Sequence, residues 1–96
     1  MMVIDKERLL IHSLKLGSTI AFDRIYQMYA KRLYAYSLQF TKSAEDAEEI
    51  VEDSLLWIWE NRETLVIESS LSSYLFKMVY RKALNKLAHI DATQRA

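Results

Sequence analysis

The chain has 96 residues, enough for one domain with its own core. It contains no cysteine, no proline and one glycine. This composition excludes a disulfide scaffold and a thiolate metal site, and it favours helices over a turn-rich β fold. No apolar run is long enough for a membrane span, and the N-terminus lacks the layout of a signal peptide. We therefore expect a soluble, cytoplasmic domain without membrane insertion.

The formal net charge is zero, but the charges are sorted into three blocks. Residues 1–42 carry seven basic and three acidic side chains, residues 43–68 one and nine, and residues 69–96 five and one. A single charged run usually does no more than solvate a helix surface. Sorting into blocks indicates two partners of opposite charge.

Two helices are predicted in the first basic block. Residues 5–16 form a short one, which Gly17 ends. Ser18 is an N-cap for a longer helix that reaches about residue 40, with Lys31 and Arg32 beside its apolar stripe. The stripe recurs in steps of three and four residues at Phe22, Ile25, Tyr26, Tyr29, Leu33, Tyr36 and Phe40.

The acidic block predicts a third helix over residues 43–62. Ser43 is its N-cap, and Asp46 stands three residues later as in a capping box. Carboxylates fill its first half, where the helix dipole favours them, and bulky apolar side chains fill its second half.

Residues 63–70 are predicted to form an ordered loop, and Ser70 to cap a last helix from residue 71 to about 89. Residues 90–96 are expected to fray.

At 100° per residue, one arc of this last helix faces the core: Leu75, Phe76, Val79, Tyr80, Ala83, Leu84 and Leu87. The opposite arc carries Tyr74, Lys77, Arg81, Lys82, Asn85 and His89. Such side chains can contact phosphates, base edges and an unpaired base, although a solvated helix face has the same composition.

Motifs for catalysis are missing from the sequence. His12 and His89 lie on different predicted helices, and no Glu-x-x-His pair accompanies the carboxylates. There is no P-loop or Gly-rich nucleotide turn. We expect neither an enzyme nor a bound cofactor or metal.

Three segments in this order resemble region 2 of bacterial extracytoplasmic-function sigma factors, over about residues 8–88. The first segment matches at Ala21, Phe22, Tyr26, Tyr29, Leu33 and Tyr34. The second matches at Asp46, Ala47, Glu48, Glu49, Val51, Asp53 and Trp59. The third matches at Ser70, Leu71, Tyr74, Leu75, Ala83 and Leu87. The chain departs from the family pattern at Tyr80-Arg81, where Arg-Asn is usual, and at Asn85, where Asp is usual.

The resemblance implies an all-α fold, a compact bundle of one short and three longer helices. Residues 1–90 would be the region 2 domain and residues 91–96 a frayed tail or the start of a linker. The C-terminal helix-turn-helix domain of the family would not be part of this chain.

The implied function is to dock on the β′ clamp helices of core RNA polymerase and to recognise and melt the minus-ten promoter element. The polymerase-binding residues would be Asp46, Glu49, Glu52 and Asp53. The residues that bind promoter DNA, mainly its non-template single strand, would be Tyr74, Lys77, Arg81, Lys82, Asn85, Glu68, Ser69, Ser70, Lys31 and Arg32. An anti-sigma factor is a further implied partner.

Two other readings remain open at this point. One is a helical protein-interaction domain that uses the acidic helix as its interface and has no nucleic-acid role. The other is a carboxylate-metal enzyme, which would retain bound metal.

Overall fold

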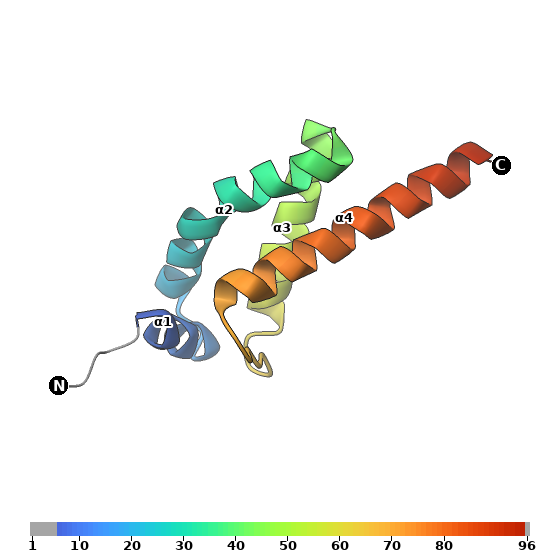
Figure 1. The fold of residues 1–96 in the computed structure, drawn as a ribbon. Helices are drawn as coiled ribbons and strands as arrows, with labels where there is room; N and C mark the ends of the chain where they lie inside the picture. Colours follow the sequence, from blue (N-terminus) through green and yellow to red (C-terminus); the bar gives the residue numbers. More distant parts are fainter. Residues whose placement is uncertain (1–5, 96) are drawn as a thin grey trace.

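The computed structural model describes residues 6–95, and side chains for residues 6–90. This part of the chain contains four helices and no strand: α1 (Lys6–Lys15), α2 (Thr19–Thr41), α3 (Ala44–Glu60) and α4 (Leu71–Arg95) (Figure 1). The predicted all-α fold of one short and three longer helices is confirmed. Asp5, where the first helix was expected to begin, lies outside the described residues.

The helix boundaries follow from local capping chemistry. The Ser18 hydroxyl accepts a hydrogen bond from the N–H of Ala21 at 3.1 Å, and the Ser43 hydroxyl accepts one from the N–H of Asp46 at 3.3 Å. Both predicted N-caps are therefore confirmed. Gly17 has a φ of 92° and Lys42 a φ of 54°, so each of the first two helices is followed by a residue in the left-handed region.

The core lies between α2, α3 and α4, and each helix contributes one apolar stripe to it. The largest side chains that are fully buried there include Ile25, Leu33, Leu55, Ile58, Leu71, Leu75 and Val79. Burial of each such side chain stabilises the fold by roughly 1.5–3 kcal/mol relative to its exposure. The polar side of every helix consequently faces outward.

The loop between α3 and α4 is held to the bundle by its own side chains. Leu65 is buried in the core. The guanidinium of Arg62 lies 4.2 Å from the centroid of the Trp59 ring, and it donates a hydrogen bond to the Trp59 carbonyl at 2.9 Å. At the end of the loop, the hydroxyl of Ser70 accepts a hydrogen bond from the N–H of Ser73 at 3.1 Å, as expected for an N-cap.

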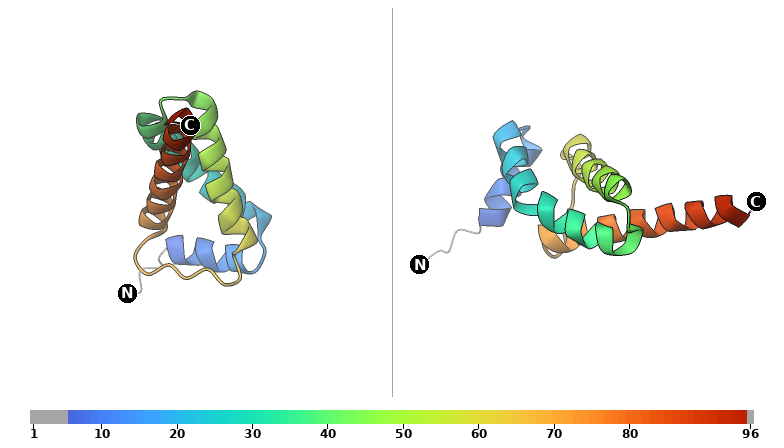
Figure 2. Two further views of the ribbon diagram at one scale, coloured as in Figure 1. Left: turned by 90° about the vertical axis from the view of Figure 1, so that its right-hand side faces the viewer. Right: turned by 90° about the horizontal axis from the view of Figure 1, so that it is seen from above.

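Helix α1 lies across the end of the bundle, beside the start of α4 (Figure 2). There the N–H of Leu71 donates a hydrogen bond to Oε1 of Glu7 at 3.2 Å. A carboxylate at this position satisfies a free N–H of the first turn and interacts favourably with the helix dipole. Tyr29 is buried nearby, and burial, with a smaller contribution from the Glu7 carboxylate, raises the pKa of its hydroxyl.

Two expectations for α4 were wrong. The helix continues to Arg95 instead of ending near residue 89, since neither glycine nor proline interrupts residues 90–95. Tyr80 and Leu84, expected in the core, are 41% and 42% exposed. Each directly follows a buried residue of α4, Val79 or Ala83, so its side chain points about 100° away from the core around the helix.

The Glu7–Leu71 hydrogen bond can be tested by substitution. We expect Glu7→Ala to lower the free energy of unfolding by about 1 kcal/mol, because the first turn of α4 loses a charged acceptor. Glu7→Gln keeps an acceptor oxygen and should lose less. Urea denaturation followed by circular dichroism measures both changes. Glu63→Ala, a change at an exposed loop position, is the matched control, and coincident curves for Glu7→Ala and Glu63→Ala would contradict the assignment.

Candidate functional site

The outward side of α3 carries most of its carboxylates, and we call this surface the acidic face. It forms because Ala47, Ile50, Ser54 and Ile58 turn inward, which leaves the acidic positions half a turn away in solvent. Its exposed members are Glu45, Glu48, Glu49, Glu52, Asp53 and Glu60. Leu56 lies among them and is 50% exposed.

Two of the four carboxylates predicted to bind the polymerase already have a partner within the chain. The ammonium of Lys86 in α4 lies 2.8 Å from Oε2 of Glu49 and 3.5 Å from Oδ1 of Asp46. The hydrogen bond that the Lys86 ammonium donates to Glu49 is the main cause of the raised pKa of Lys86. Glu52 and Asp53 have no ion pair of this kind among the bonds found in the described residues, so the least neutralised part of the acidic face lies around them.

Lys86 was assigned no role from the sequence. On the helical wheel it lies about 20° from Leu75, on the core-facing arc. The ion pairs of Lys86 could have been predicted from this position. A cation on the buried side of one helix needs a carboxylate partner, and the neighbouring helix is strongly acidic.

Lys31 and Arg32 are adjacent in sequence but lie on different sides of α2. Lys31 lines a small hollow of about 230 Å³ between α2 and α3, together with Tyr26, Tyr34, Glu48 and Glu52. Arg32 faces α4, with its guanidinium 5.7 Å from the centroid of the Phe76 ring and 5.3 Å from that of Tyr29. The structure therefore does not bring Lys31 together with the basic residues of α4.

An open groove between α2 and α4 combines aromatic rings with cations, and we call it the aromatic groove. Its hollow of about 330 Å³ is lined by Tyr36, Ser73, Phe76, Lys77 and Tyr80. The ring of Tyr36 packs edge-on against Phe76 at 5.0 Å between centroids, and the ring of Phe40 packs edge-on against Tyr80 at 5.3 Å.

Sequence reasoning did not identify the aromatic groove, because it placed Phe76 and Tyr80 in the core and Tyr36 in the apolar stripe of the second helix. The available signal was the concentration of aromatic residues at the edges of both stripes, next to Arg32 and Lys77. Partly exposed rings beside cations are suited to stack unpaired bases and to neutralise phosphates.

The remaining predicted DNA-binding residues of α4 differ in accessibility. Lys77, Arg81 and Asn85 are exposed, and Lys82 is half-buried. Tyr74 is half-buried against Trp57, with the ring centroids 6.1 Å apart. Burial raises the pKa of the Tyr74 hydroxyl, and the charge of Arg81 partly opposes this shift.

The three predicted DNA-binding residues of the loop also differ in accessibility. Glu68 and Ser69 are exposed. The Ser70 hydroxyl, in contrast, is occupied by its hydrogen bonds with the N–H and the hydroxyl of Ser73. Ser70 therefore serves as the cap of α4 and has little remaining capacity for a ligand.

The described residues give no support to metal or membrane sites. Within this part of the chain, no three His, Cys, Asp or Glu side chains are grouped closely enough to hold a metal ion. None of the described helices has the length and apolarity needed to cross a membrane.

The Lys86 ion pairs lead to a prediction about salt and pH. We expect Lys86→Ala to lower the urea midpoint of unfolding at low ionic strength, and the difference from wild type to shrink as salt is added. Since the pKa of Lys86 is raised above its usual 10.5, its contribution is fully present below that pH and is lost as the pH rises through the folded-state pKa. Lys77→Ala, at an exposed position of the same helix, is the control, and equal midpoints for the two variants at low salt would contradict the prediction.

Comparisons with known proteins agree with the resemblance seen in the sequence. A family model described as Sigma-70 region 2 matches residues 25–93. Among solved structures, the chain is similar to the "NMR structure of the complex formed by an engineered region 2 of sigmaE in complex with GTAAAA", with a TM-score of 0.76 and 17% sequence identity over 93% of each chain. At that identity the likeness shows a shared fold. No curated protein sequence matches the chain significantly. Because the family model spans most of its length, the chain belongs to the Sigma-70 region 2 family.

Proposed function

We propose that this chain is the region 2 domain of an extracytoplasmic-function sigma factor that works in the cytoplasm. In this role it binds core RNA polymerase through its acidic face and promoter DNA through the aromatic groove and the exposed side of α4. The observation that carries the proposal is the position of these two surfaces. An acidic surface on α3 and a basic, aromatic surface between α2 and α4 lie on different sides of one region 2 fold.

The family assignment bears on the rival readings. Sigma-70 region 2 is a non-enzymatic domain of transcription initiation, so the expectation that the chain is not an enzyme is confirmed. A carboxylate-metal enzyme is thereby excluded. The aromatic groove favours a sigma factor over a protein-interaction domain without any nucleic-acid role, because its partly exposed rings beside cations suit unpaired bases and phosphates.

Polymerase docking would use the part of the acidic face that Lys86 leaves unneutralised. Glu52 and Asp53 would contribute most, and Asp46 and Glu49 less, since their charge is shared with Lys86. The partner would be the β′ clamp helices, with basic residues facing these carboxylates. Complementary charge favours rapid and oriented association. Leu56, exposed among the carboxylates, would supply an apolar contact.

DNA binding would combine two kinds of contact. Arg32 and Lys77 would neutralise phosphates on either side of the aromatic groove, while the rings of Tyr36, Phe76 and Tyr80 would stack with unpaired bases. Arg81, Lys82 and Asn85 would continue the contact surface along α4. Glu68 and Ser69 in the exposed loop would contribute to the pocket for a flipped base. The similar engineered region 2 of sigmaE, solved with GTAAAA, supports a single strand as the ligand.

An anti-sigma factor would inhibit this domain by covering the same two surfaces. Such a factor would need basic groups opposite the acidic face. The proposal therefore predicts that an inhibitor and core polymerase compete for the chain.

Charge reversal on α3 tests the docking role. We expect the double substitution Glu52→Lys with Asp53→Lys to weaken capture of core polymerase by at least about tenfold, because the two charges most available to the partner become repulsive. Capture on an affinity resin measures the loss, and circular dichroism verifies that helicity is kept. Asp23→Lys with Glu63→Lys, two exposed positions off the acidic face, changes the net charge equally and should have little effect. If the α3 variant is captured as well as this control, the acidic face is only a solvated surface.

Salt-dependent binding tests the DNA role. Fluorescence anisotropy with labelled single-stranded minus-ten DNA, with and without core polymerase, should show log K falling linearly with log salt. We expect Arg32→Ala with Lys77→Ala to make this slope shallower by about 1.4, the value for two phosphate contacts on a single strand. Tyr80→Ala should weaken binding by about fivefold or more at an unchanged slope, because stacking is lost and no charge is removed.

Lys31→Ala is the matched control for these substitutions, because it removes a cation on the other side of α2. It should leave both the affinity and the slope close to wild type. Binding that is insensitive to salt, or equal losses for Lys31 and for the pair Arg32 and Lys77, would contradict the aromatic groove as the DNA site.

A further inference from the structure

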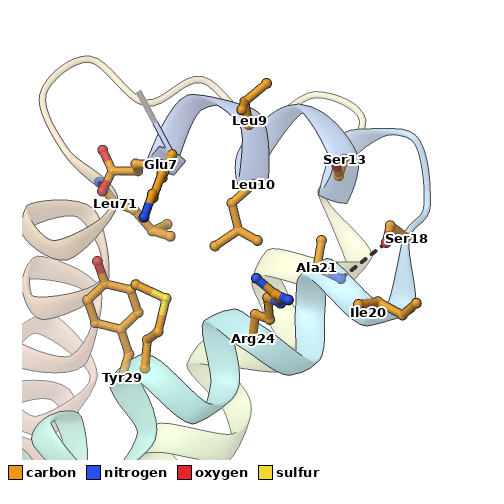
Figure 3. Close-up of a pocket in the computed structure, with 12 residues that line it drawn as sticks. Glu7, Leu9, Leu10, Ser13, Ser18, Ile20, Ala21, Arg24, Tyr29 and Leu71 are labelled. Atoms are coloured by element: carbon orange, nitrogen blue, oxygen red, sulfur yellow. Dashed lines mark hydrogen bonds between the residues drawn. The ribbon is translucent and has the colours of Figure 1, made fainter. Parts of the chain in front are cut away.

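A third surface, separate from the acidic face and the aromatic groove, lies between α1 and α2 (Figure 3). It is a hollow of about 550 Å³, and we call it the N-terminal groove. Its walls are Leu9, Leu10 and Ser13 on α1 and Ile20, Arg24 and Met28 on α2. Glu7, Tyr29 and Leu71 lie toward one end of it, where α1 meets the start of α4.

The walls of the groove expose apolar side chains that have no cover in the bundle. Ile20 is 71% exposed, Leu9 53% and Met28 52%. Contiguous exposed apolar side chains are rare on the surface of a protein without a partner. A cluster of three at one hollow therefore indicates an interaction site. None of these residues belongs to the acidic face or to the aromatic groove.

The spacing along α2 indicates the shape of the occupant. Ile20, Arg24 and Met28 recur every four residues, so they form one row about 12 Å long, a little over two helical turns. A groove whose row has apolar side chains at both ends and a cation between them fits an amphipathic helix that carries apolar and charged side chains on neighbouring positions.

The charged residues that line the groove indicate the sign of the charge that its partner carries. The two cations that line it, Lys6 and Arg24, are both exposed, and Arg24 extends into the space between α1 and α2 (Figure 3). The one lining carboxylate, Glu7, accepts the hydrogen bond from Leu71. We propose that the N-terminal groove binds an acidic amphipathic helix of another protein, with its apolar stripe against Leu9, Ile20 and Met28 and its carboxylates facing Arg24 and Lys6.

The chain's own helices fit the groove poorly. The acidic face of α3 has the right charge, but its exposed large apolar side chains, Leu56 and Trp57, are adjacent in sequence and point about 100° apart, so they form no stripe. Helix α4 exposes the apolar Leu84, but Lys77 and Arg81 lie within about 60° of it around the helix and would face Arg24 with like charge. Charge and apolar spacing together therefore favour a different protein over a second copy.

Two synthetic peptides of roughly 18 residues, five helical turns, test the inference. The acidic probe has leucines at i, i+4, i+7 and i+11 with glutamates flanking them, and the basic probe has lysine in place of each glutamate. In fluorescence anisotropy at low salt, we expect the acidic probe to bind with a dissociation constant on the order of 10 µM and the basic probe at least about tenfold more weakly.

Substitutions at exposed groove positions locate the site without disturbing the core. Ile20→Ser should weaken binding of the acidic probe by at least about fivefold, because it removes the most exposed apolar contact. Arg24→Glu should invert the preference, so that the basic probe binds better than the acidic one. Val66→Ser, at a loop position that is 70% exposed, is the matched control and should bind like wild type.

Several results would overturn the inference. These are no binding of the acidic probe at millimolar concentration, equal affinity for both probes, or an affinity that Ile20→Ser and Arg24→Glu leave unchanged. A dimer in sedimentation equilibrium that Ile20→Ser dissociates would assign the groove to a second copy instead. This inference and the proposed sigma function can fail independently of each other. Glu52→Lys with Asp53→Lys should weaken polymerase capture and leave binding of the acidic probe intact.

Discussion

Burial of one apolar stripe of α4 between α2 and α3 is the constraint on which the other surfaces of this domain depend. The stripe consists of Leu71, Leu75, Val79 and Ala83, all fully buried. Once it faces inward, Lys77 and Arg81 on the opposite side of α4 must face solvent, and its flanking rings must lie along α2. The inward stripe of α3 has the same effect on its carboxylates. Both charged surfaces are therefore consequences of how the core is packed.

Lys86 limits how fully those two surfaces are separated. It extends from the inward side of α4 to Glu49 and Asp46 on α3, and so joins the basic helix to the acidic one. An exposed ion pair of this kind contributes little to stability, but it neutralises part of a surface that is proposed to bind a basic partner. The docking surface is thereby concentrated toward Glu52 and Asp53. A partner that competes for Glu49 must also displace Lys86.

Helix α1 adds little to the core but organises the end of the bundle. Through Glu7 it supplies a charged acceptor to the first turn of α4, next to the loop that contains the proposed DNA-binding residues Glu68 and Ser69. Its other side forms a wall of the N-terminal groove. The same short helix thus stabilises the start of α4, the proposed DNA-binding helix, and leaves Leu9 exposed.

The sequence by itself determined the four helices, the N-caps of the last three and the all-α fold, because capping bonds and apolar periodicity act over only three or four residues. The order of its three motifs also indicated region 2 of a sigma factor, which the match to Sigma-70 region 2 confirmed. Tertiary structure alone decided which charged residues meet. Glu7 bonds a residue 64 positions away, and Lys86 one 37 positions away. Lys31 and Arg32 point about 100° apart around α2, so one lies beside α3 and the other beside α4. Only packing could place them, because contacts between distant segments leave no local pattern in the sequence.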